Sequence, residues 1–140
     1  MSVTFSIKGV DFDPSADLYS PQDHSLWFNL ANANARELLA WVSCEPADPD
    51  DLYGELPARG LAALCRRRLW DVDRNHDAAK PGYEERSPNH ATTIECGRDA
   101  DYLRVRTGWL LAMCERALTT EGDDAVIGFG YCNMLRWELR

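Results

Sequence analysis

The chain begins with a segment in which apolar and polar residues alternate. From Val3 to Lys8 every second residue is polar, which is the period of a strand that buries one face. Leu26 to Phe28 is rich in aromatic residues, which favour strands, and we expect it to pair antiparallel with the first segment. Ala125 to Phe129, after Gly122, predicts a further strand, whereas residues 131–140 are compatible with a strand or a short helix.

The clearest helix signal begins at Asn34. Asparagine is a strong N-cap, and Glu37 lies three residues later, where its carboxylate can accept a hydrogen bond from the amide of the cap. Apolar residues then follow at helical spacing, until Pro46 and Pro49 prevent the helix from continuing. The sequence therefore predicts a helix from Asn34 to about Cys44.

Two further helices are predicted downstream. Pro57 suits the first turn of a helix, because the amide that it lacks would have no partner there. The residues after it place an apolar stripe on one face: Leu61, Leu64, Cys65 and Leu69. Arginines 66–68 lie near the end of this helix, where cations suit the helix dipole. The third helix, from about Asp99 to Thr119, is the longest predicted element.

Residues 73–89 form a polar run between the second and third helices. A connector of this length is usually functional or mobile. Strand signals flank a helical middle without alternating with helices, so we expect an α+β fold in which a small antiparallel sheet packs against about three helices. A chain of 140 residues can bury one core, and residues 1–140 are expected to form a single domain.

The chain is acidic, with 15 basic and 23 acidic side chains and a formal net charge of −8. This charge disfavours non-specific binding to nucleic acid and to anionic membranes. It is compatible with a basic protein partner, and it equally serves solubility. We expect a monomer or a small homo-oligomer.

The cysteines and the apolar runs indicate the compartment. No apolar run approaches the length of a membrane span, and the first residues lack the apolar core of a signal peptide, so we expect a cytoplasmic protein. The five cysteines are odd in number and contain no CxxC motif, which indicates reduced thiols. Cys65, Cys96 and Cys114 have apolar or small neighbours and are expected to behave as small hydrophobic residues.

The motifs of common catalytic sites are missing from the sequence. The histidines His24, His76 and His90 fall in expected loops without a partner at metal-binding spacing, so no metal site is predicted. No glycine-rich nucleotide-binding motif precedes a helix, and no GxSxG motif is present. We therefore expect no cofactor, and these absences weigh against enzymatic activity.

Four residues near the start of the third helix are candidates for binding an anionic ligand: Cys96, Arg98, Tyr102 and Arg106. A helix N-terminus and a nearby guanidinium both favour the thiolate form of a cysteine, which would make Cys96 a nucleophile. The alternative is a cysteine packed at a strand end, with Gly97 making the turn and Asp99 capping the helix. The arginines could equally cover the edge of the core with their stems.

Five tryptophans are many for a small domain. Aromatic side chains contribute strongly to protein interfaces. Most are expected in the core, and Trp27, Trp70 and Trp137 are the candidates for a partner surface.

Three segments resemble a group of small bacterial proteins with no established activity. They are NLANANAREL at residues 29–38, LYGELP at residues 52–57, and the pair Gly97-Arg98 followed by Tyr102-Leu103. The resemblance spans roughly residues 29–118. It implies a bacterial or phage origin and a shared fold, and it implies no catalytic role.

The leading hypothesis is a non-enzymatic binding protein, such as a regulator, an inhibitor or an immunity-type partner. This hypothesis rests on the acidity of the chain, its surplus of tryptophan and the missing catalytic motifs. The alternative is a small-anion-binding protein or a minor enzyme that uses the four residues near the start of the third helix.

Overall fold

A computed structural model of the chain describes residues 2–10, 23–44, 52–71, 79–86, 92–95 and 97–131. Within these ranges, an antiparallel sheet has the strand order β2-β1-β6-β3. Its strands are β1 (Ser2–Ile7), β2 (Trp27–Ala31), β3 (Gly54–Pro57) and β6 (Val126–Tyr131). The predicted antiparallel pairing of the first two strands is confirmed, and the strand predicted from Ala125 pairs with the other edge of β1.

An aromatic stack lies at the centre of this sheet. Phe5 on β1 is opposite Phe28 on β2 and Phe129 on β6, with ring centroids 5.0 Å and 5.8 Å away. Gly54 on β3 leaves room for the third ring, since a Cβ atom there would lie 2.9 Å from Cζ of Phe129. The three buried rings therefore join strands from both ends of the chain.

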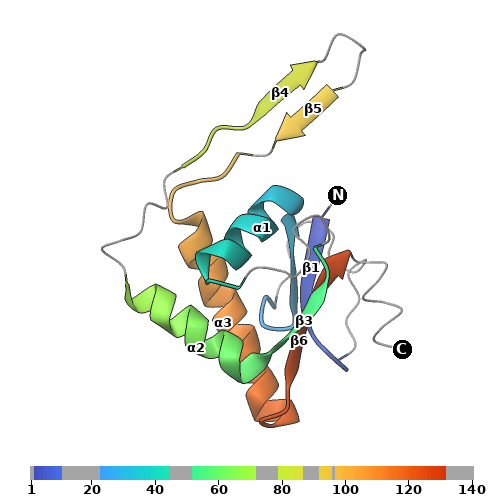
Figure 1. Ribbon diagram of the computed structural model, residues 1–140, viewed down its shortest axis with the longest axis vertical. Helices are drawn as coiled ribbons and strands as arrows, with labels where there is room; N and C mark the ends of the chain where they lie inside the picture. Colours follow the sequence, from blue (N-terminus) through green and yellow to red (C-terminus); the bar gives the residue numbers. More distant parts are fainter. Residues whose placement is uncertain are drawn as a thin grey trace.

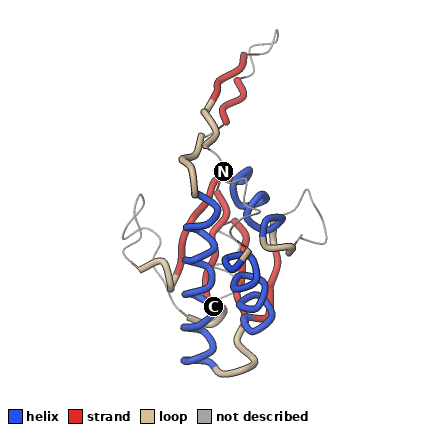
Figure 2. The backbone as a smooth tube through the Cα atoms, turned by 90° about the vertical axis from the view of Figure 1, so that its left-hand side faces the viewer, coloured by secondary structure: helices blue, strands red, loops and turns tan. Residues whose placement is uncertain are grey.

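Three helices cover one face of the sheet (Figures 1 and 2). They are α1 (Asn32–Trp41), α2 (Ala58–Trp70) and α3 (Tyr102–Glu121). Helices α2 and α3 pack against each other, and Leu61 and Cys65 of α2 are buried with Leu110 and Met113 of α3. The predicted α+β architecture, a small antiparallel sheet with three helices, is confirmed.

Strand β1 is buried on both faces, so the prediction of a strand with one buried face is wrong. Thr4 and Ser6, on the side away from Phe5, are 0% and 1% exposed. The Thr4 hydroxyl donates a hydrogen bond to Oδ1 of Asn29 on β2. Hydrogen bonding within the sheet accounts for the burial of Thr4, whereas the buried hydroxyl of Ser6 has no partner among the described residues.

The predicted start of the first helix is also wrong. Strand β2 runs directly into α1, so that Ala31 is the N-cap residue and no side chain caps the helix. Asn34 lies within the first turn and is buried. The Glu37 carboxylate therefore does not accept a hydrogen bond from an N-cap amide, and it binds Lys80 and Arg98 instead.

The starts of the other two helices lie closer to their predicted positions. Pro57 ends the edge strand β3 and is the N-cap residue of α2, one position before the first turn. Helix α3 begins at Tyr102, and Asp99 does not cap it: Asp101, in the left-handed region at φ 63°, is the N-cap residue. The residues before Tyr102 do not extend the helix, because the backbone of Arg98 forms a β-bridge with that of Lys80.

The polar run contains a strand that its composition does not indicate. Strands β4 (Tyr83–Arg86) and β5 (Thr92–Glu95) pair antiparallel as a separate two-stranded sheet. Residues 73–78 and 87–89 of the run lie outside the described ranges.

We predict that Phe5→Ala lowers the free energy of unfolding by about 3–5 kcal/mol, because it removes the middle ring of the stack and leaves a cavity. Val105→Ala is the control, since Val105 is 46% exposed and should change stability by no more than ~0.5 kcal/mol. Urea unfolding measures both variants. Similar losses in the two would contradict a core organised around Phe5.

Candidate functional site

The hairpin of β4 and β5 projects beyond the sheet and the helices (Figures 1 and 2). We call the described residues between 79 and 100 the arm. Its two strands pair in register from Tyr83 opposite Glu95 to Arg86 opposite Thr92. An isolated two-stranded hairpin is marginally stable in water, so the contacts at its base matter for its position.

The two chain segments of the arm meet closely at the base. Lys80 and Arg98 exchange two backbone hydrogen bonds, each 2.8 Å long. A Cβ atom at Gly97 would lie 2.5 Å from the amide nitrogen of Gly82 and 2.7 Å from the carbonyl oxygen of Lys80. Only glycine fits this close approach of two backbones, which gives Gly97 a structural role.

One carboxylate holds the arm base against α1. Lys80 Nζ lies 3.0 Å from Oε1 and 3.2 Å from Oε2 of Glu37, and Arg98 donates to the same carboxylate. The Arg98 side chain is only 5% exposed, whereas that of Glu37 is 39% exposed. A guanidinium stays charged when buried and therefore needs a counter-charge within reach. We call Glu37, Lys80 and Arg98 the arm latch.

The arm latch changes the acidity of Glu37. Burial alone would raise the pKa of this carboxyl, but hydrogen bonds and charges from Lys80 and Arg98 outweigh it, so the pKa lies below the ordinary value of a glutamate. The carboxylate is therefore ionised across the neutral pH range, where it pairs with Lys80 and Arg98.

A second cluster stacks along α3. Arg106 lies 4.2 Å from the ring centroid of Tyr102 and 3.9 Å from that of Trp109. The imidazole of His24 is stacked on Trp109, with centroids 3.4 Å apart. Burial and the charge of Arg106 lower the pKa of His24 against the opposing effect of Asp23. The stack thus favours a neutral imidazole.

The residues predicted to bind an anion are engaged by different partners. Arg98 is bound to Glu37 of α1, whereas Arg106 is held between two aromatic rings of α3 that include Tyr102. Cys96 lies outside the described residues. Sequence reasoning missed Glu37 as the partner of Arg98, because its spacing from Asn34 suggested a local role.

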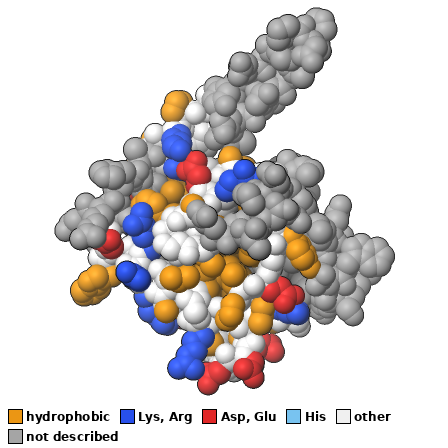
Figure 3. Space-filling model, viewed as in Figure 1, with side chains coloured by type: hydrophobic (Ala, Val, Ile, Leu, Met, Phe, Trp, Pro, Cys, Tyr) orange, Lys and Arg blue, Asp and Glu red, His pale blue; other side chains and the backbone are white. Residues whose placement is uncertain are grey.

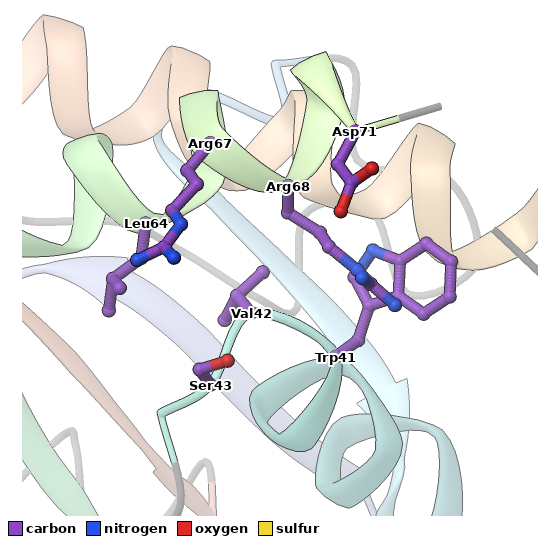
Figure 4. Close-up of a pocket in the computed structure, with 7 residues that line it drawn as sticks. All are labelled: Trp41, Val42, Ser43, Leu64, Arg67, Arg68 and Asp71. Carbon is purple, nitrogen blue, oxygen red and sulfur yellow. The ribbon is translucent and has the colours of Figure 1, made fainter. Parts of the chain in front are cut away.

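A pocket with a volume of about 230 Å³ lies between the C-terminal ends of α1 and α2. Its lining consists of Trp41, Val42, Ser43, Leu64, Arg67, Arg68 and Asp71 (Figure 4). The guanidinium of Arg68 stacks on Trp41 at 3.9 Å from the ring centroid. The sequence placed these arginines at a helix end but carried no signal that Trp41 would face them.

The described thiols are poor nucleophiles. Burial raises the pKa of Cys65 to about 12 and also raises that of Cys114 and of Cys44. The prediction that Cys65 and Cys114 are buried is confirmed. Among the residues that the structure describes, no three His, Cys, Asp or Glu side chains are grouped to hold a metal ion.

The tryptophans predicted for a partner surface have different environments. Trp70, at the end of α2, is 89% exposed, whereas Trp27 is 7% exposed and belongs to the interior. Trp137 lies outside the described residues. Within the described ranges, none of the helices is long and apolar enough to cross a membrane.

We predict that Glu37→Gln weakens the arm latch, because it leaves the buried charge of Arg98 without a counter-charge. The expected loss of stability is about 1–3 kcal/mol, toward the lower end because Glu37 is partly exposed. Amide hydrogen exchange at Lys80 and Arg98 should become faster. Glu55→Gln is the matched control: Glu55 pairs with Lys8 at 2.8 Å and both side chains are at least 40% exposed, so less than ~1 kcal/mol is expected.

The same pair of variants has a pH signature. The folded-state pKa of Glu37 is depressed, so its contribution to stability is present above the ordinary glutamate pKa and is lost as the pH falls through the lowered value. Glu37→Gln should remove this acid-dependent loss. Acid unfolding curves that are identical for the wild type and Glu37→Gln would contradict the latch.

We predict that an NMR titration of His24 gives a pKa below that of a free histidine. His24 then takes up a proton at a lower pH in the folded state than in the unfolded state, so the stability of the fold decreases as the pH drops below the ordinary histidine pKa. Arg106→Gln should raise the His24 pKa partway, because it removes one of the two causes. A normal or raised value in the wild type would contradict the stacked arrangement.

Comparisons with known proteins do not assign the chain to a family. No family model matches it, and searches of curated proteins and of solved structures find no significant match.

Proposed function

We propose that this protein is a non-enzymatic binding protein, of bacterial or phage origin, that recognises a basic protein partner through the arm. The observation that carries the proposal is the projection of β4 and β5 from the body of the domain (Figure 1). Outward edges of a two-stranded sheet present backbone N–H and C=O groups that another chain can pair with. Strand addition to such an edge is a common mode of protein recognition.

The charge of the two strands of the arm supports a basic partner, while the arm from residue 79 to residue 100, with three basic and four acidic side chains, has a net charge of −1. Strands β4 and β5 contain three glutamates and one arginine, a net charge of −2. The whole chain adds to this with its net charge of −8. Complementary charge steers the encounter between partners and disfavours acidic competitors.

The arm latch supports the same proposal energetically. A hairpin that moved freely would lose conformational entropy when it bound, whereas a hairpin held at its base has already lost part of it. Glu37 and Arg98 hold the base, and Gly97 allows the two backbones to meet there. The described thiols offer no comparable support for nucleophilic catalysis, because burial favours the neutral thiol.

The test compares two double charge reversals. Glu84→Lys/Glu85→Lys alters the arm, and Asp123→Lys/Asp124→Lys makes the same change in net charge in the exposed turn between α3 and β6. A protein captured from a bacterial lysate is purified, and its affinity for the wild type and both variants is measured by calorimetry at two salt concentrations. We expect at least a tenfold loss for the arm variant, a much smaller loss for the turn variant, and weaker binding at higher salt.

Two results would contradict the proposal. Equal losses in both double variants would show that general charge, and not the arm, binds the partner. Sedimentation analysis that finds a wild-type dimer, dissociated by Glu84→Lys/Glu85→Lys, would place a second copy of the chain on the arm in place of a basic partner.

A further inference from the structure

The pocket between α1 and α2 has a lining that differs in charge from the acidic strands β4 and β5. Helix α2 carries four arginines and no acidic residue, and basic side chains lie along this side of the molecule (Figure 3). Two of these arginines, Arg67 and Arg68, line the pocket with a single carboxylate, that of Asp71. The charged lining is therefore net positive on a chain whose formal net charge is −8.

Two residues that line the pocket carry buried donors. The indole nitrogen of Trp41 and Nε of Arg68 are buried and have no hydrogen-bond partner among the described residues. A buried N–H group without an acceptor destabilises the fold. A ligand that supplies acceptor atoms would recover this cost.

The two arginines lie on either side of the pocket. Figure 4 shows Arg67 and Arg68 reaching from α2 to either side of Val42, at the end of α1. Stacking on Trp41 fixes the plane of the Arg68 guanidinium, so less entropy is lost when it binds. Guanidinium groups match carboxylates through paired N–H donors.

The remaining lining limits the size and polarity of the ligand. Val42, Leu64 and the Trp41 ring provide apolar surface, and a volume of about 230 Å³ lies below the usual range for drug-sized ligands. We infer that this pocket binds a small organic acid, with its carboxylate on Arg67 and Arg68 and its apolar part against Val42 and Leu64. The inference does not rest on the arm or on its partner.

The experiment uses benzoate as the probe and its neutral analogue benzamide as the matched ligand control. The ¹⁵N-labelled wild-type protein is titrated while the indole N–H resonance of Trp41 is followed, and its assignment comes from Trp41→Phe. Benzoate should shift this resonance to saturation, and benzamide should bind far more weakly. Arg67→Gln and Arg68→Gln should each weaken benzoate binding roughly tenfold or more, because each loses a charge-assisted hydrogen bond.

Arg66→Gln is the matched protein control. Arg66 is on the same helix, but it pairs with Glu115 of α3 at 3.4 Å and does not line the pocket. The affinity of the Arg66→Gln variant for benzoate should therefore stay within about twofold of the wild-type value. Dispersed spectra of each variant show that it is folded.

Three outcomes would overturn the inference: no saturable shift with benzoate, equal binding of benzamide, or an equal loss in Arg66→Gln. Inorganic phosphate that binds at the same resonance as tightly as benzoate would overturn the assignment to an organic acid. None of these outcomes bears on the arm, so they are distinguishable from a failure of the proposed function.

Discussion

The buried charge of Arg98 is the constraint on which the position of the arm depends. Its guanidinium cannot give up its proton, and only 5% of its side chain is exposed. Such a charge is tolerated only beside a carboxylate, which Glu37 supplies from the middle of α1. Lys80 donates to the same carboxylate from the opposite segment of the arm. One acidic side chain therefore connects both ends of the hairpin to the body of the domain.

The position of Glu37 depends in turn on the core. Leu38 and Leu39, which follow it, are fully buried, and α1 continues from β2 without a loop. Strand β2 is fixed by its pairing with β1 and by the stack of Phe28 on Phe5. Packing in the sheet thus orients α1, and α1 orients the carboxylate that holds the arm. Aromatic packing and a distant ion pair are parts of one arrangement.

Two surfaces of opposite charge result from this fold. Strands β4 and β5 carry net negative charge and project from the domain, whereas α2 carries arginines without an acidic residue. In water at physiological salt, charges more than about 8 Å apart are largely screened from each other. Under the two proposals, strands β4 and β5 meet a basic partner and the pocket between α1 and α2 takes a small acid, so the net charge of −8 for the whole chain describes only the first of these contacts.

The sequence by itself determined the elements whose signals are local. Aromatic content and apolar spacing located β1, β2, β6 and the three helices, and the lack of strand–helix alternation indicated the α+β class. Helix starts were less well determined, because a side-chain cap contributes only about 1 kcal/mol and continuity with β2 replaced it at Ala31. Strand β4 was missed because a polar strand that stands apart from a core has no apolar period to detect, and β5 was anticipated only in the interpretation that placed Cys96 at a strand end.

Only the tertiary structure decided which groups meet. The spacing of Asn34 and Glu37 is that of a capping box, yet the carboxylate binds Arg98, 61 residues away. A carboxylate can accept from a nearby amide or from a distant guanidinium with similar geometry. The choice between them depends on which donor would otherwise be buried with its charge unpaired, and burial is a property of the folded chain.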